Sequence, residues 1–118
     1  MIMSNSVTFT LPYPPSANRY WRNVRGMVIK SEEARNYQTE AGWLAKQSGF
    51  DCTNQPVSVT MYVYRPQKRG DLDNSIKVLL DSLKGIIYTD DDQVVSIHAE
   101  RYDDKRNPRV EVLIEEVA

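Results

Sequence analysis

The chain has 118 residues, of which 41% are hydrophobic and 26% are charged, and its formal net charge is −1. This balance is typical of a globular domain and excludes a disordered tail, a collagen-like repeat or a membrane protein, which needs an apolar run of about 20 residues. The near-neutral charge also excludes the overall basicity of many nucleic-acid-binding domains. The length predicts one domain over residues 1–118.

The cysteine content and the first residues bear on the compartment. One cysteine, Cys52, excludes an intramolecular disulfide and a cysteine-cluster metal site, and we expect it to be a small apolar filler. Residues Met1–Leu11 lack the basic start and long apolar stretch of a signal peptide. We therefore expect a cytoplasmic protein with no membrane partner.

The first half of the chain predicts a strand and a helix. Ser6–Leu11 alternates apolar and polar residues, which indicates a half-buried strand, and the prolines of 12–15 then impose a stiff loop. Asn18–Gly26 is polar, basic and aromatic, and predicts a loop or an irregular hairpin. Ser31 is a good helix N-cap, and Gly49 offers a C-terminal stop, so a helix is expected between them.

The second half predicts a further strand, a helix and two more strands. Val57–Tyr64 alternates as a strand does, and an apolar face at helical spacing then predicts a short helix that ends near Gly85. Val94–Tyr102 and Arg109–Val117 indicate two strands, and the short turn between them favours an antiparallel hairpin. The order β-α-β-α-β-β predicts an α/β sandwich with a mixed sheet, two main helices, and helices on one or both faces.

Charged side chains are unevenly distributed along the chain. Basic residues come first, at Arg19, Arg22, Arg25 and Lys30 and again at Arg65, Lys68 and Arg69. Acidic residues gather later, at Asp71, Asp73, Asp81 and Asp90–Asp92. This pattern suits a polyanion held over bound metal ions, and it equally suits an ordinary mixed surface.

Three features surround the second predicted helix. Asp71 and Asp73 stand two residues apart where an extended approach would aim them at one point, and Lys77 follows Asp73 by one helical turn. Asp90 and Asp91 belong to the acidic turn after the helix. Carboxylates that converge repel one another unless a cation holds them, and Mg²⁺ prefers oxygen ligands of this kind. We expect Asp71, Asp73 and the acidic turn Asp90–Asp92 to converge on a cation, which fits metal-assisted phosphodiester hydrolysis with the lysine stabilising developing charge.

Each feature taken singly also has an ordinary structural interpretation. The first two aspartates can cap a helix, the later three can form a solvated turn, and Lys77 can pair with Asp73 or Asp81. His98 is expected to be a surface or packing residue. Tyr20 and Trp21 fit base stacking and core or loop packing equally well.

Taken together, these motifs resemble the RusA family of Holliday junction resolvases. The resemblance runs over most of the chain and rests on Leu11-Pro12-Tyr13-Pro14-Pro15-Ser16-Ala17-Asn18-Arg19-Tyr20-Trp21-Arg22, Asp71-Leu72-Asp73-Asn74, Lys77 and Asp90-Asp91-Asp92-Gln93-Val94-Val95. Order, spacing and total length agree with the family pattern.

The resemblance implies a dimeric α/β nuclease that needs Mg²⁺, with Mn²⁺ as a substitute. It implies that Asp71, Asp73 and Asp91 bind metal and are catalytic, with Asp90 as a helper, and it assigns the catalytic helix lysine of the family to Lys77. The sequence departs from the family at Gly70, which interrupts the basic run, and at Asp92, which makes the turn more negative. Both departures bear on DNA affinity more than on catalysis.

The resemblance leads to the following expectation of function. A homodimer with twofold symmetry, in which each subunit contributes one metal site, places the two sites against opposed strands of a four-way junction and makes paired nicks. The basic residues Arg19, Arg22, Lys68 and Arg69 are candidates for phosphate contacts. Two alternatives remain: a nuclease that prefers flaps or forks, and a non-catalytic dimer that binds DNA or protein.

Overall fold

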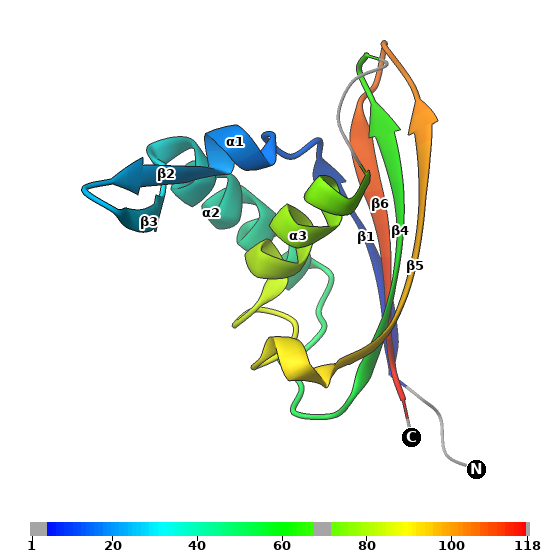
Figure 1. The fold of residues 1–118 in the computed structure, drawn as a ribbon. Coiled ribbons are helices and arrows are strands. Elements are labelled where there is room, and N and C mark those ends of the chain that lie inside the picture. The colour runs from blue at the N-terminus through cyan, green and yellow to red at the C-terminus, as the bar shows by residue number, and fades with distance from the viewer. Residues whose placement is uncertain (1–4, 68–71, 118) are drawn as a thin grey trace.

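The computed structural model describes residues 5–67 and 72–117 (Figure 1). The strands are β1 (Ser6–Pro12), β2 (Trp21–Val24), β3 (Met27–Lys30), β4 (Val57–Arg65), β5 (Val94–Asp103) and β6 (Arg109–Glu116). The helices are α1 (Ala17–Tyr20), α2 (Glu32–Gln47), α3 (Leu72–Leu83) and the 3₁₀ turn η1 (Asp91–Gln93). Within the described ranges, no helix is both long enough and apolar enough to cross a bilayer.

Four strands form one mixed sheet in the order β1-β6-β4-β5. β6 pairs antiparallel with both β1 and β4, whereas β4 and β5 run parallel. Both α2 and α3 lie on the same side of the sheet, and no helix of the described residues lies on the other side (Figure 1). The predicted α/β sandwich with a mixed sheet and two main helices is therefore confirmed, with its helices on one face.

The predicted hairpin of the last two strands is wrong, because β4 lies between β5 and β6. The reason lies in their side chains. Val110, Val112 and Ile114 of β6 are almost fully buried, so β6 needs a neighbour on each side, which β1 and β4 provide. β5 buries none of its side chains fully and takes the edge instead.

The core lies between the sheet and the two long helices. Alternate residues of β4 point into it, and Val57, Val59 and Met61 are fully buried. The ends of α2 follow the prediction: the Ser31 hydroxyl accepts a hydrogen bond from the Ala34 N–H at 3.0 Å, and Gly49 has a φ of +82° that favours glycine.

The N-terminal polar stretch forms a helical turn followed by a two-stranded hairpin, β2–β3, that projects from the body of the molecule (Figure 1). An irregular hairpin was among the expectations, whereas the turn of α1 was not predicted. Arg25 and Gly26 both have positive φ, at 52° and 79°, as a tight hairpin turn requires. At the tip, Met27 and Val28 are exposed.

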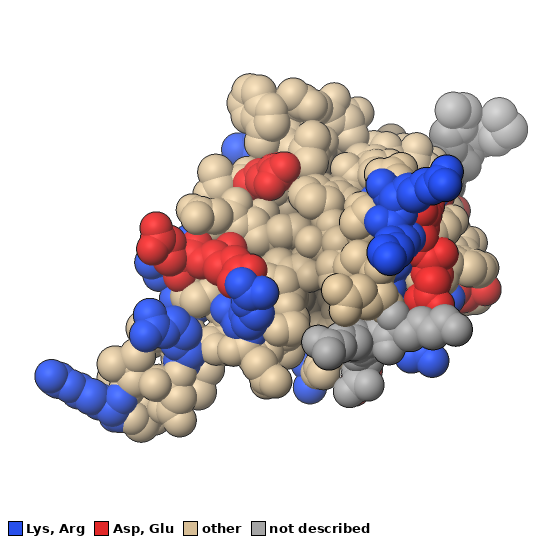
Figure 2. Space-filling view, turned by 90° about the horizontal axis from the view of Figure 1, so that it is seen from above, with Lys and Arg blue, Asp and Glu red and all other residues tan. Residues whose placement is uncertain are grey.

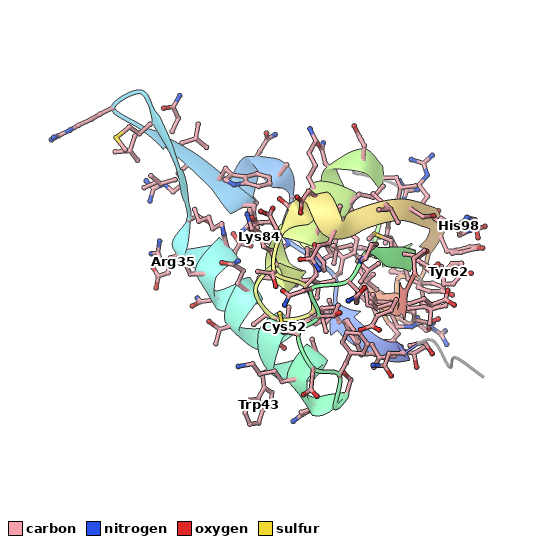
Figure 3. All side chains as sticks on the ribbon, turned by 90° about the horizontal axis from the view of Figure 1, so that it is seen from below. Arg35, Trp43, Cys52, Tyr62, Lys84 and His98 are labelled. Carbon is pink, nitrogen blue, oxygen red and sulfur yellow. The ribbon has the colours of Figure 1, made fainter. Side chains whose placement is uncertain are left out.

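The bare face of the sheet carries an aromatic row. Tyr62 and His98 point away from the helices (Figure 3), and their ring centroids are 6.3 Å apart. His98 is exposed, and its Nε2 lies 2.8 Å from a carboxylate oxygen of Glu100. His98 is thus the surface residue that the sequence predicted. Cys52 is also exposed, so its prediction as an apolar filler is wrong.

Candidate active site

Asp73 stands at the beginning of α3. Because the helix starts at Leu72, Asp73 lies in its first turn and not on the extended segment that the sequence suggested. Its side chain is exposed, and the positive end of the helix dipole stabilises a carboxylate there. Asp71, Lys68 and Arg69, which were also predicted for the site, lie outside the described residues.

Lys77 follows Asp73 by one turn and is exposed. Of the two described carboxylates that could pair with it along the helix, Asp73 and Asp81, neither lies within 4.0 Å of its ammonium. The ordinary interpretation of this lysine as a helix-surface ion pair with Asp73 or Asp81 is therefore not supported. Its ammonium lies on the same helix face as Asp73, four residues along.

Asp81 is engaged elsewhere. Its carboxylate accepts a 2.5 Å hydrogen bond from the Tyr20 hydroxyl and lies 2.9 Å from the Lys30 ammonium. Tyr20 is fully buried, and this burial, together with the hydrogen bond to Asp81, raises the pKa of the Tyr20 hydroxyl well above its usual value. Core packing is thus confirmed for Tyr20, and Asp81 connects α3 to α1 and β3.

The acidic turn that precedes β5 has a defined internal structure. Asp90 is the N-cap residue of η1: its N–H donates to the Gln93 side-chain oxygen at 2.8 Å, and its carbonyl oxygen accepts from the Gln93 N–H at 3.1 Å. Asp91 and Asp92 are exposed, and an Asp91 carboxylate oxygen lies 4.0 Å from the Lys84 ammonium. Asp90 therefore has a capping role, while Asp91 and Asp92 face solvent.

The Gln93 side chain uses its full hydrogen-bonding capacity. Its carbonyl oxygen accepts bonds from the N–H groups of Thr89 and Asp90, both at 2.8 Å. Its amide nitrogen donates to the carbonyl oxygens of Thr53 at 2.8 Å and Gln55 at 2.9 Å. No role was predicted for Gln93, although Asp followed three residues later by Gln is a sequence signature of a helix N-terminus.

Asp73 and the acidic turn that contains Asp91 lie at opposite ends of α3. Asp73 is in the first turn, whereas Asp91 lies beside Lys84, which directly follows the last turn. A helix of 12 residues is about 18 Å long. Figure 1 shows α3 beginning toward the ends of β4 and β5, and η1 lying at their start. Asp73 and Asp91 of one chain thus lie toward opposite ends of α3, and their convergence on a cation stays a prediction.

The metal donors in the described part of the chain reflect this separation. No group of three His, Cys, Asp or Glu side chains there is close enough to hold a metal ion. The donor chemistry nevertheless fits a hard divalent cation, because the exposed side chains Asp73, Asp91 and Asp92 offer carboxylate oxygens alone.

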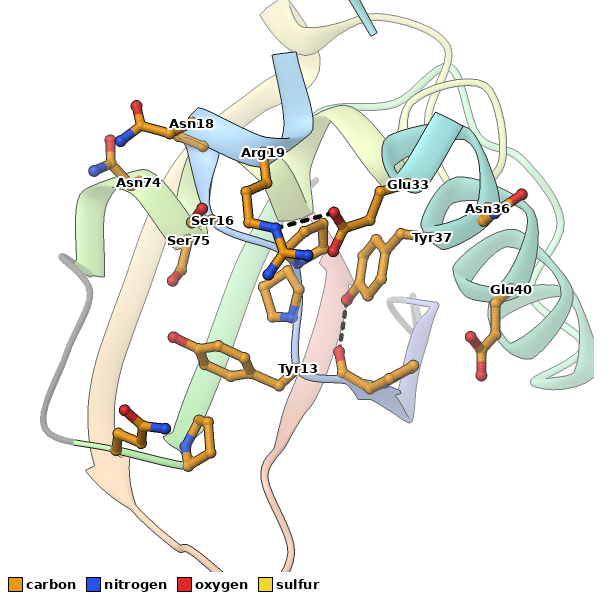
Figure 4. A pocket seen from close by; sticks show the side chains of 16 residues that line it. Tyr13, Ser16, Asn18, Arg19, Glu33, Asn36, Tyr37, Glu40, Asn74 and Ser75 are labelled. Carbon is orange, nitrogen blue, oxygen red and sulfur yellow. Dashed lines mark hydrogen bonds and ion pairs between the residues drawn. The ribbon is translucent and has the colours of Figure 1, made fainter. Parts of the chain in front are cut away.

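A cleft of about 830 Å³ opens beside the first turn of α3 (Figure 4). It lies between the proline-rich loop after β1, α2 and the start of α3, and its polar lining includes Tyr13, Asn18 and Asn74. The Tyr37 hydroxyl donates to the Pro12 carbonyl oxygen at 2.7 Å and holds the loop in place. The cleft gives an elongated ligand access to the Asp73 end of α3.

Of the four residues predicted to contact phosphate, the structure describes Arg19 and Arg22. Arg19 lines the cleft, and its guanidinium lies 3.2 Å from the Glu33 carboxylate, whereas Arg22 is exposed on β2. Figure 2, which views the molecule from above, shows basic and acidic groups side by side at both ends and no continuous basic face. On this face the charge distribution matches the mixed surface that the sequence left open.

The similarity to known proteins extends over almost the whole chain. The family model described as endodeoxyribonuclease RusA matches residues 12–115, a range that contains every predicted site residue. The chain belongs to the RusA family. Crossover junction endodeoxyribonucleases RusA of Escherichia coli K12 and Shigella sonnei, and that of Enterobacteria phage 82, are each 34% identical to it over 116 residues. Each alignment covers 96% of this chain and 97% of the relative, so RusA membership applies to the complete α/β fold described above.

Proposed function

We propose that this RusA protein is a structure-selective endodeoxyribonuclease that resolves four-way DNA junctions by paired, symmetric nicks in recombination and repair. The observation that carries the proposal is the family match over residues 12–115, since it includes both acidic groups. The relatives are named crossover junction endodeoxyribonucleases.

We propose Mg²⁺ as the metal, with Mn²⁺ as a substitute, held by Asp71, Asp73 and Asp91 and assisted by Asp90. When bound, such an ion supplies neutralisation of phosphate charge and a lower pKa of the attacking water. The chain's own groups orient the substrate around it. Lys77 is exposed on the same helix as Asp73, where its ammonium stabilises negative charge that develops on the scissile phosphate.

The separation of Asp73 and Asp91 supports a homodimer in which each site is shared by two chains. If a site needs both carboxylates and one chain holds them at opposite ends of α3, the second carboxylate has to come from a partner. A twofold axis then produces two equivalent sites, one for each of two opposed strands of a junction.

The edge strand β5 is the surface we propose for this pairing. It is ten residues long, contains neither Pro nor Lys, and has a free edge because the sheet ends there. Ile97 pairs with the fully buried Val59 and shares its face of the sheet, yet Ile97 is 46% exposed, because the helices do not cover it. Val95 beside it is 58% exposed.

Antiparallel pairing of β5 with a second β5 places the start of each strand beside the end of the other. η1 with Asp91 directly precedes β5, whereas α3 with Asp73 begins toward the opposite end of that strand (Figure 1). Such a dimer therefore brings Asp91 of one chain toward Asp73 of its partner. The geometry of the chain thus supports the metal site and the dimer together.

The deciding experiment incubates the purified protein with a synthetic mobile four-way junction, with and without Mg²⁺, and maps cuts on all four strands. Paired cuts at symmetric positions, abolished by a chelator, are expected. A panel of flaps and forks tests the alternative substrate class, and faster cutting of those substrates would overturn junction selectivity. Absence of metal-dependent nicking on every substrate would favour the non-catalytic dimer.

A further inference from the structure

Gln93 attaches the acidic turn to the body of the protein through four side-chain hydrogen bonds. It lies at the end of η1, between the exposed carboxylates and the first residue of β5. Its side chain bonds two N–H groups on one side and two carbonyl groups on the other, all between 2.8 and 2.9 Å. No group with only donors or only acceptors can make these contacts.

The segment that receives the amide nitrogen is itself fixed. The Thr53 N–H donates to the Ile87 carbonyl oxygen at 3.0 Å, and Thr53 forms a bridge with the fully buried Tyr88. Two residues after Gln55, the fully buried Val57 begins β4. Gln93 therefore joins a turn on the surface to a segment that is held by the core.

The turn needs such an attachment because of its charge. Asp90, Asp91 and Asp92 are consecutive, and like charges at this spacing repel one another. The only cation within 4.0 Å of Asp91 among the described residues is the ammonium of Lys84, which is 46% exposed and on a flexible stem. The four hydrogen bonds of Gln93 thus restrain the backbone that carries Asp91, beside the bond that the Thr89 hydroxyl donates to the Asn54 side-chain oxygen at 2.7 Å.

We propose that Gln93 is a positioning residue for the metal site: it holds the Asp90–Asp91 backbone so that the Asp91 carboxylate is preset for a divalent cation. Gln93 touches neither the cation nor DNA and acts through Asp91. This inference rests on the proposed function, because it takes Asp91 as a metal ligand. Partners that orient metal ligands in this way typically change metal affinity by about 10–100-fold when they are replaced.

The test is Gln93→Met, which keeps the length and neutrality of the side chain and removes all four hydrogen bonds. Mn²⁺ binding to the metal-free protein is measured by electron paramagnetic resonance of the free ion. We expect the Kd for Mn²⁺ to rise by about 10–100-fold. The Mn²⁺ concentration for half-maximal junction cleavage should rise in parallel, the rate should recover at saturating Mn²⁺, and junction binding without metal should stay unchanged.

Two further variants make the test decisive. Gln47→Met changes an exposed glutamine at the end of α2 and should behave as the wild type. Gln93→Asn keeps the amide but is one methylene too short to reach both sides, so it should weaken Mn²⁺ binding less than Gln93→Met. If Gln93→Met does not fold, Gln93→Asn decides the question on its own.

The possible failures can be told apart by including Asp91→Asn. If Asp91→Asn weakens Mn²⁺ binding and a folded Gln93 variant does not, the positioning role is overturned while the proposed function stands. If Asp91→Asn leaves Mn²⁺ binding and cleavage unchanged, the metal role of Asp91 fails, and the inference about Gln93 fails with it. Cleavage lost at every Mn²⁺ concentration with unchanged Mn²⁺ affinity would also contradict the inference.

Discussion

The Lys84 ammonium lies 4.0 Å from the Asp91 carboxylate, and this contact places the acidic turn at the end of α3 opposite to Asp73. Both ends carry exposed carboxylates, and about 18 Å of helix lies between them. The proposed site shared between two chains would account for this arrangement, and it makes a prediction that a site within one chain does not.

Mixed dimers of Asp73→Asn and Asp91→Asn chains should regain nicking. In a mixed dimer with shared sites, one site carries both substitutions and the other carries neither, so one strand of the junction is cut. Two differently tagged chains are co-expressed, the mixed dimer is purified through both tags, and nicks are mapped on the four strands. If each site lies within one chain, both sites of the mixed dimer are damaged, and the absence of nicking would refute the shared site.

Each single aspartate variant, made as a uniform dimer, should lose cleavage and keep junction binding. Asp71→Asn, Asp73→Asn and Asp91→Asn each remove one negative charge from a surface that approaches phosphates, so binding without metal should be equal or tighter. Gel-shift binding and cleavage of a labelled junction measure the two properties separately. A variant that cuts at the wild-type rate would show that its aspartate has no catalytic role. Glu32→Gln, at the exposed start of α2, is the matched control for the loss of one charge.

The sequence predicted which segments form strands and helices better than it predicted which strands pair with each other. Alternating apolar residues identified β4, and the cap at Ser31 identified α2, because burial and capping are local requirements. The pairing of β5 depends on which strand buries more apolar surface, and a short turn does not determine that. The relative positions of Asp73 and Asp91 do not follow from their spacing in the sequence, because α3 lies between them.

Ile97→Asp should convert the proposed dimer to monomers. A carboxylate on the free edge of β5 costs desolvation free energy when that edge is covered by a second chain, and the side chain is 46% exposed in the single chain, so the fold should tolerate the change. Sedimentation velocity gives the association state. Thr8→Asp on β1, the opposite edge of the sheet, is the control. A dimer that survives Ile97→Asp with unchanged affinity would exclude β5 as the interface.

Lys77→Ala should slow cleavage by about 10²–10³-fold, the usual effect of removing one group that stabilises developing negative charge. Junction binding should change little, because one exposed lysine contributes only a small part of the affinity for phosphates. Single-turnover rates at saturating enzyme, compared with gel-shift binding, separate the two effects. Lys46→Ala, an exposed lysine in the last turn of α2, should alter neither. Equal losses of rate and binding would assign Lys77 to DNA contact.

Tyr20→Phe should lower the free energy of unfolding by about 1.5–3 kcal/mol, the range for a hydrogen bond to a charged group. The Tyr20 hydroxyl is the 2.5 Å donor to Asp81, and its loss leaves the Lys30 ammonium as the carboxylate's described polar partner. The Asp81 side chain is 26% exposed, so water can replace part of the lost hydrogen bond, which favours the lower end of this range. Urea unfolding monitored by circular dichroism measures the change. Tyr102→Phe removes a hydroxyl that donates to Glu100 at 3.0 Å on the exposed face of the sheet, and it should cost much less. Equal effects of the two substitutions would contradict a stabilising role for the Tyr20–Asp81 contact between α1 and α3.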